Sequence, residues 1–430
     1  MMNIKSVPFA PLIAAMAALF FVPSPSLAQE AAWAPLITEL KEKYPDLAAR
    51  RKLAKSIGAA AGAKMAWDDP MIELGLMDAP VDGFALDREE MTRKTIGVTQ
   101  NIPSYGKRLS ARNLARAEEK MAEVDAGVMT AELVAELKKS VYELAYAHKA
   151  LGTLKETDVI LEEFVLVANA KYSAGKGLQT DVIKAQVERT RLSEKRLILA
   201  EQAGLAKVMI NRLLGRDEAA DFAVPPELLT APEALDFEKS WVAASQNSPL
   251  LKLAGVNVDR ARSMLEKEKA EKGLDMSFMA EYAQREDSPM ERPDLFSVKA
   301  SISVPLWSSI KQDKYIAGAQ LGVEEALDRK NDMEKRLRAE LMKSALSAKK
   351  EADVIKLFRT AILPQATQAF QSAMAAYQQD KVEFLTLLEN ERMLLEYELE
   401  LEEAVMRLRS LCADAEAMTG AATTAGGKNE

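Results

Sequence analysis

Proline placement is the feature of this sequence that most limits how the chain can fold. No proline occurs between Pro103 and Pro225, or between Pro305 and Pro364. Proline removes a helix hydrogen bond and clashes with the preceding turn, so these proline-free stretches favour very long helices. Residues 104–174 are rich in Ala, Leu, Glu, Lys and Arg, which are strong helix formers. A continuous helix of about 70 residues would be roughly 105 Å long, which a compact globule cannot contain.

Composition excludes several classes of chemistry. The chain of 430 residues has one histidine, His148, and one cysteine, Cys412, so disulfide frameworks and clustered Cys/His zinc sites are excluded. A net charge of -8 argues against nucleic acid as a main partner. The segment 58–64 lacks the spacing and hydroxyl of a phosphate-binding loop. A Ser-His-Asp enzyme could be built only around His148. We predict no enzyme activity, no catalytic residue, no cofactor and no bound metal.

The first residues have the layout of a secretory signal peptide. Lys5 precedes an apolar core at residues 12–22, which is followed by Pro23, Pro25 and the small-residue triplet Ser26-Leu27-Ala28. An apolar core of this length is too short for a membrane anchor, which needs roughly 20 residues. We predict a signal peptide at 1–28 with cleavage after Ala28, and hence an exported protein.

The remaining chain resembles a duplicated unit. A shift of about 202–205 residues superimposes similar segments. The matching pairs are Tyr44-Pro45-Asp46-Leu47 with Asn247-Ser248-Pro249-Leu250, Ile102-Pro103 with Val304-Pro305, and Lys171 to Lys176 with Ala376 to Lys381. We predict a first repeat at 29–214, a proline-containing linker at 215–238, a second repeat at 239–419 and a disordered tail at 420–430.

Each repeat contains a predicted β-hairpin followed by a long helical hairpin. In the first repeat these lie at about 71–103 and about 104–214, and in the second at about 274–305 and about 306–419. Apolar and polar residues alternate with period two in the strands, for example Phe296, Val298, Ala300 and Ile302 against Ser297, Lys299 and Ser301. This pattern fits a strand with lipid on one side and water on the other, and equally a half-buried strand of a soluble sandwich. Four strands cannot close a barrel around water, so a barrel would need other subunits.

The predicted helices carry coiled-coil seams. In the first long helix the apolar series is Val134, Leu137, Val141, Leu144, His148 and Leu151. His148 is therefore expected to be a structural seam residue. In the last helix Phe384, Leu387, Leu394, Leu401 and Leu408 follow a similar rhythm, which Glu391 and Glu398 interrupt, and Cys412 is expected to be a small packed apolar group.

Three segments, taken together with the duplication, resemble a known family. They are residues 69–77, residues 91–106 with Ile96-Gly97-Val98-Thr99-Gln100-Asn101-Ile102-Pro103, and the predicted turn at residues 172–182. Over residues 36–420, approximately, the chain resembles the TolC-type outer-membrane efflux proteins. Within this family it is most similar to the heavy-metal (CusC/CzcC-like) branch.

The resemblance implies a mixed α and β fold, internally duplicated. Each chain of a homotrimer would give four strands to a 12-stranded outer-membrane β-barrel, surrounded by lipid, and its long helices to an α-helical coiled-coil barrel crossing the periplasm. Its tip would dock on a periplasmic adaptor (membrane fusion protein) and an inner-membrane RND-type pump.

The resemblance also implies functional positions at that tip. The adaptor-docking turns would be formed by Gly175, Lys176, Gly177 and Leu178 in the first copy and by Asp380, Lys381 and Val382 in the second. Tyr377 matches a tyrosine that ties the closed state in related channels, and Pro364 should kink the helix before it. Thr386 and Glu389 stand where those channels carry rings of aspartate, while Asp181 and Lys184 are the equivalents in the first copy. A ring of Glu389 carboxylates would favour cations.

Three functions remain open from the sequence. The leading hypothesis is a passive exit duct for heavy-metal cations in a tripartite efflux system. The second is an exit duct for drugs or for type I secreted polypeptides. The third, from another class, is a soluble periplasmic coiled-coil scaffold without a barrel.

Overall fold

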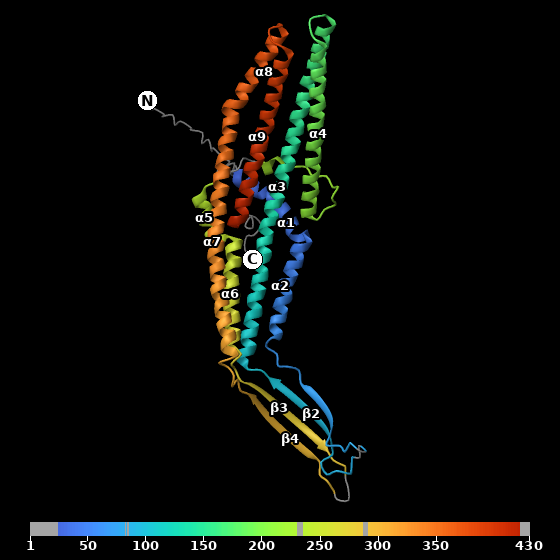
Figure 1. Ribbon diagram of the computed structural model, residues 1–430, viewed down its shortest axis with the longest axis vertical. Coiled ribbons are helices and arrows are strands. Elements are labelled where there is room, and N and C mark those ends of the chain that lie inside the picture. The colour runs from blue at the N-terminus through green and yellow to red at the C-terminus, as the bar shows by residue number, and fades with distance from the viewer. Residues whose placement is uncertain (1–24, 82, 84–85, 230–234, 287–290, 422–430) are drawn as a thin grey trace, which may run out of the picture.

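The computed structural model describes residues 25–81, 83, 86–229, 235–286 and 291–421 (Figure 1). Residues 1–24 of the predicted signal peptide and 422–430 of the predicted tail lie outside the described residues. The molecule is elongated, with a sheet at one end and the tips of the long helices at the other (Figure 1).

The first half comprises α1 (Pro25–Lys43), α2 (Pro45–Ala63), β1 (Met71–Met77), β2 (Arg93–Ile102), α3 (Tyr105–Ser173), α4 (Gln179–Leu214) and the short η1 (Pro226–Leu229). The second half comprises α5 (Phe237–Asn247), α6 (Pro249–Ala270), β3 (Asp275–Gln284), β4 (Leu295–Ser303), α7 (Gln312–Leu357), η2 (Phe358–Ile362), α8 (Leu363–Gln378) and α9 (Phe384–Thr419).

The long helices follow the proline-free stretches. The helix α3 has 69 residues, and α4 returns beside it for 36. The helices α2 and α6 each begin with a proline, where the missing N–H costs no helical hydrogen bond. The helix α4 ends at Gly215, whose φ of 62° is the left-handed conformation that glycine adopts without a side-chain clash.

The second half departs from an uninterrupted helical hairpin in two places. Residues 306–311 form hydrogen-bonded turns, so α7 begins at Gln312 rather than near residue 306. Before Pro364 the chain forms a π-helical turn, η2. Proline has no N–H to donate and crowds the carbonyl four residues earlier, and a π turn accommodates both effects.

The sheet has the order β1-β2-β3-β4, and every neighbouring pair is antiparallel. Its register aligns the alternating apolar residues of the four strands into rows on one face. One row is Ile72, Val98, Ala280 and Val298, and the next is Leu74, Ile96, Tyr282 and Phe296. All of the large side chains in these rows are exposed. The strand positions between these two rows carry polar residues such as Glu73 and Glu281, whose side chains point to the opposite face of the sheet.

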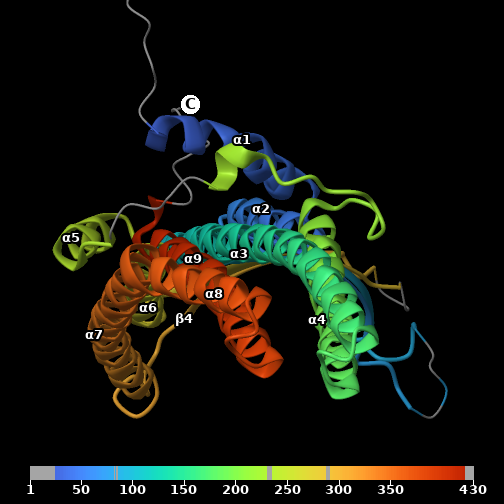
Figure 2. The same ribbon diagram turned by 90° about the horizontal axis from the view of Figure 1, so that it is seen from above.

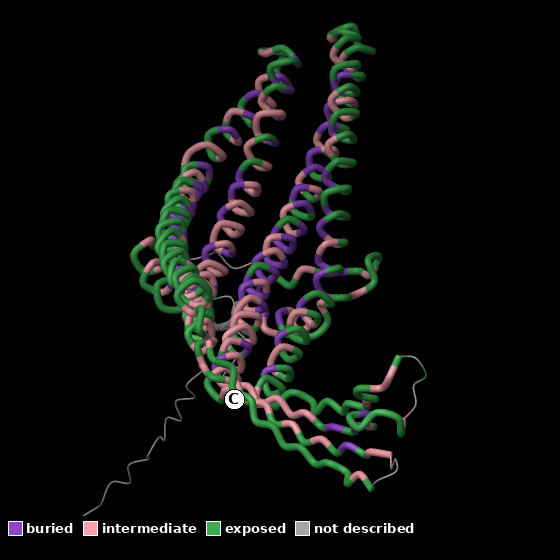
Figure 3. Tube along the Cα trace, turned by 60° about the horizontal axis from the view of Figure 1, so that its bottom comes forward, coloured by how far each residue is buried: buried purple, intermediate pink, exposed green. Residues whose placement is uncertain are grey.

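The buried core runs along the helices rather than under the sheet (Figure 3). One cluster joins α1, α3 and α4 and includes Trp33, Leu137, Leu144 and Ile210. A second cluster lies toward the helix tips and includes Leu154, Leu161, Phe164 and Phe384. Seen from above, the long helices form a curved wall with α1 on its outer side (Figure 2). None of the described helices combines the length and apolar character needed to cross a membrane.

The predicted seam of α3 is right in its first half and wrong at His148. Val134, Leu137, Val141 and Leu144 are fully buried, whereas His148 is exposed. The buried series continues instead through Ala147, Ala150 and Leu154. A straight helix drifts relative to a strict seven-residue repeat, and small alanines allow close approach at the shifted positions. His148 is therefore a surface residue.

Candidate functional tip

The candidate site lies where α3 turns into α4 and α8 turns into α9, at the end of the molecule opposite the sheet (Figure 1). The two turns close in the same way. The amide of Lys176 donates to the carbonyl of Lys171 at 2.8 Å, and the amide of Lys381 donates to the carbonyl of Ala376 at 2.9 Å. These are the six-to-one hydrogen bonds of helix C-caps. The tip therefore repeats in its geometry the similarity that the sequence shows.

Each turn needs a residue in the left-handed conformation. Gly175 supplies it in the first turn, with a φ of 69°. Asp380 supplies it in the second, with a φ of 57°. Aspartate is one of the few non-glycine residues that adopt this conformation regularly. Gly177 also lies close to α3, since a Cβ there would lie 3.0 Å from the Cβ of Lys171 and would force a small shift.

The two turns are joined by one side chain of α3. The Nζ of Lys171 donates to the backbone carbonyl of Tyr377 at 2.7 Å and to Oδ1 of Asp380. The same Nζ lies 4.0 Å from the ring centroid of Tyr377. We call Lys171, Tyr377 and Asp380 the Lys171 clamp. The hydrogen bond from Lys171 lowers the pKa of the Asp380 carboxyl.

An aromatic cluster lies directly behind the clamp. The Tyr377 ring centroid is 5.4 Å from that of Phe384, and Phe164 lies 6.2 Å from Phe384 and 6.3 Å from Phe370. All four rings are buried and come from α3, α8 and α9. Burial raises the pKa of the Tyr377 hydroxyl, with smaller effects of the Asp181 and Asp380 carboxylates. The clamp therefore sits on a small apolar core that couples the two helical hairpins.

The other predicted site residues lie at or near this tip. Asp181 is half-buried in the first turn of α4, close enough to affect the Tyr377 hydroxyl. Lys184, Thr386 and Glu389 are exposed on α4 and α9. The turn residues that were predicted to dock the adaptor are exposed or half-buried, and Leu178 is 67% exposed.

Two further groups were not singled out from the sequence. Lys171 entered only as part of the repeat match, although it makes the contacts between the turns. Glu391 entered as an interruption of the α9 seam, and it is 4% exposed. Beside it, Arg392 of α9 donates from Nε and Nη2 to the Glu188 carboxylate of α4 at 3.1 and 2.5 Å. A charged residue at an apolar seam position is the signal that pointed to Glu391.

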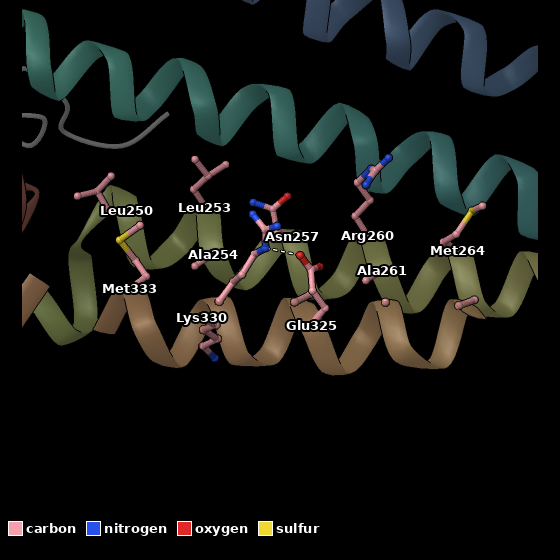
Figure 4. A pocket seen from close by; sticks show the side chains of 14 residues that line it. Leu250, Leu253, Ala254, Asn257, Arg260, Ala261, Met264, Glu325, Lys330 and Met333 are labelled. Atoms are coloured by element: carbon pink, nitrogen blue, oxygen red, sulfur yellow. Dashed lines mark hydrogen bonds and ion pairs between the residues drawn. The ribbon is translucent and has the colours of Figure 1, made fainter. Parts of the chain in front are cut away.

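A groove of about 490 Å³ lies away from the tip, between α6 and α7 (Figure 4). It is lined mainly by small and apolar residues, among them Ala254, Ala261, Gly322 and Met333, and Glu325 pairs with Arg329 along α7. Among the described residues there is no group of three or more His, Cys, Asp or Glu side chains that could bind a metal ion. The small and apolar lining gives the groove the character of a helix-packing surface.

Comparison with known proteins identifies this architecture. Residues 36–216 match the family model described as "Outer membrane efflux protein". No curated protein sequence matches the chain. The outer membrane protein VceC of Vibrio cholerae has a similar structure, with a TM-score of 0.76, 19% identity, and coverage of 93% of this chain and 99% of VceC.

Two other channel structures are similar at the same level. The outer-membrane channel OprN has a TM-score of 0.75 and 18% identity, with coverage of 92% of this chain and 91% of OprN. CusC has a TM-score of 0.72 and 14% identity, with coverage of 93% and 92%. The predicted fold class and the resemblance to outer-membrane efflux proteins are confirmed.

Proposed function

We propose that this chain, an outer membrane efflux protein by its match over residues 36–216 and by its fold, is the exit duct of a tripartite system for heavy-metal cations. Members of this family are passive channels of the outer membrane that extend into the periplasm, not enzymes. In the proposal three copies form the duct, a periplasmic adaptor binds its tip, and an inner-membrane RND-type pump delivers the substrate.

The sheet is the observation that carries this proposal. It has open edges at β1 and β4 and a continuous face of exposed apolar rows. In lipid every backbone polar group needs an internal partner, so open edges must pair with other chains. Pairing β4 of one copy with β1 of the next would close a barrel and turn the apolar rows toward lipid. A soluble scaffold would instead leave Ile72, Leu74, Phe296 and Val298 facing water.

The helices supply the periplasmic part of the duct. At 1.5 Å per residue, the 69 residues of α3 extend roughly 104 Å from the sheet to the tip. The curved wall of helices (Figure 2) would form one third of a tube in the homotrimer. This length supports a channel that reaches from the outer membrane toward a partner in the periplasm.

The tip would act as the gate and docking site. Separating the α3–α4 and α8–α9 hairpins requires the Lys171 clamp to break, because its contacts join them. An adaptor that binds the exposed turns 175–178 and 380–382 would be placed directly on this clamp. We propose that docking opens the duct by displacing Lys171 from Tyr377 and Asp380.

The cation assignment rests on Glu389 and on the resemblance to the heavy-metal branch. Glu389 is exposed on α9, close to the tip. In a trimer its three carboxylates would form a ring that attracts cations and repels anions. Thr386, three residues earlier, supplies no charge.

Two experiments test the proposal. In planar bilayers the reconstituted protein should conduct as a trimer, and Glu389→Gln should lower its cation-to-anion permeability ratio. Glu400→Gln, at an exposed position farther along α9, is the matched control. Deletion of the gene should sensitise cells to metal salts, and the wild-type gene should restore growth. Sensitisation to drugs alone, or loss of polypeptide secretion alone, would replace the metal assignment by the corresponding alternative.

A further inference from the structure

A buried carboxyl group lies in the packing between the two helical hairpins. Glu391 is 4% exposed and follows the buried Leu387 and Leu388 along α9, with the buried Leu395 next. Glu351, on α7, is the other buried acidic residue of the described chain, and its carboxylate pairs with Lys350 and Arg407. Glu391 has no ion-pair partner among the described residues. A buried carboxyl group without a cation is costly to ionise.

Charged groups of two helices, α4 and α9, act on Glu391. On α4 they are Glu188 and Lys195, and on α9 they are Arg392 and Glu398. From α3, Glu156 and Lys149 act on Glu398. Arg392, the cation with the larger effect on Glu391, is already bound to Glu188 through two hydrogen bonds. Burial, followed by the charge of Glu188, therefore raises the pKa of Glu391 to about 7.

We infer that Glu391 is a proton-sensitive latch of the tip, which holds α9 against α3 and α4 while its carboxyl is neutral and loosens this packing when the proton leaves. The inference rests on the proposed function, because it assigns the latch to the same gate. It adds a regulator that is separate from the Lys171 clamp, which lies in the turns. Proton concentration in the periplasm would then set how readily the duct opens.

The direction of the effect follows from the two pKa values. When α9 separates and Glu391 is hydrated, its pKa returns toward 4.5. The packed tip then gains stability that is fully present below pH 4.5 and is lost as pH rises through about 7. Between about pH 5.5 and pH 8 the ratio of packed to separated tips should fall on the order of tenfold per protomer.

Single-channel recording on the full-length mature protein tests this latch. The open probability of the wild type should rise on the order of tenfold from about pH 5.5 to about pH 8. Glu391→Gln, which mimics the protonated group, should stay at the low open probability at both pH values. Glu400→Gln should behave like the wild type. A pH response that is unchanged in Glu391→Gln would overturn the latch.

A spectroscopic measurement gives an independent check on the wild type. Infrared difference spectra of the detergent-solubilised trimer should contain a protonated-carboxyl stretch that titrates near pH 7 and is absent from Glu391→Gln. Its absence from the wild type would also overturn the latch. Failure of the proposed channel function would give a different result from failure of the latch. In that case no variant, including Lys171→Met, would conduct at any pH. If Lys171→Met opens the channel at both pH values while Glu391 has no effect, the latch alone is wrong.

Discussion

Lys171 and Tyr377 are separated by 206 residues in sequence, and the ammonium of one lies 4.0 Å from the ring centroid of the other. The same ammonium donates a hydrogen bond to the Tyr377 carbonyl at 2.7 Å. The contact therefore joins the two copies of the duplicated unit within one chain. A change at this one side chain is therefore expected to loosen the contact between the two helical hairpins.

Lys171→Met should open the tip. The substitution keeps the length of the side chain and removes the cation–π contact and the hydrogen bonds from Nζ. A cation–π contact contributes about 1 kcal/mol and a charged hydrogen bond about 1.5 kcal/mol, so the open probability should rise at least about tenfold. Single-channel recording in planar bilayers measures this directly.

Lys155→Met is the matched control for the clamp. Lys155 is exposed on the same helix and lies away from the turns. It should leave the open probability unchanged. Equal conductance behaviour of Lys171→Met and the wild type would show that the clamp does not restrain the tip.

Two glycine-to-alanine substitutions should have opposite effects on stability. Gly175 has a φ of 69°, so Ala there should destabilise the turn by about 1 kcal/mol. Gly152 lies inside α3 with no atom within 4 Å of an added Cβ, so Ala there should stabilise the helix by about 0.5–1 kcal/mol. Thermal unfolding of the detergent-solubilised protein should give a lower Tm for Gly175→Ala and a higher Tm for Gly152→Ala. Shifts of the same sign would contradict the assigned backbone conformation.

The seam of α3 can be tested at one buried and one exposed position. Leu137 is fully buried in the cluster with Trp33, and Leu137→Ala should cost about 2–5 kcal/mol. His148 is exposed, and His148→Ala should change stability by less than about 0.5 kcal/mol. Denaturant unfolding of both variants measures the difference. A large loss of unfolding free energy in His148→Ala would show that His148 is packed in the seam, as the sequence predicted.

The parts of the fold that depend on local periodicity could be predicted from the sequence. Alternation in 296–302 marks a strand because neighbouring side chains of a strand point to opposite faces, and the register puts Val298 and Phe296 in the exposed apolar rows. The absence of proline after Pro103 marks α3. Tyr377 could be expected at the tip because the resemblance to related channels implies a tyrosine just before the second helical turn.

The contacts between distant residues could not be predicted in the same way. Lys171 is one of 57 basic residues, and nothing in its neighbourhood shows that it reaches Asp380. The burial of Glu391 depends on how α9 packs against α3 and α4. The sequence indicated only that Glu391 occupies a seam position that is otherwise apolar. The error at His148 has a simple origin, since a strict heptad cannot show where a helix drifts out of register.

The ion pair at the base of α4 should make stability depend on acid pH. Arg216 donates from Nε and Nη2 to the Glu39 carboxylate at 3.0 and 2.6 Å, which lowers the pKa of Glu39 to about 2. A lowered pKa adds stability that is present above the ordinary value of 4.5 and is lost as pH falls through about 2. Glu39→Gln should therefore cost about 1 kcal/mol at neutral pH, since solvent screens this partly exposed pair, and much less near pH 2. Denaturant unfolding of both proteins between these pH values checks this, and a cost that persists at pH 2 would assign the effect to packing rather than to charge.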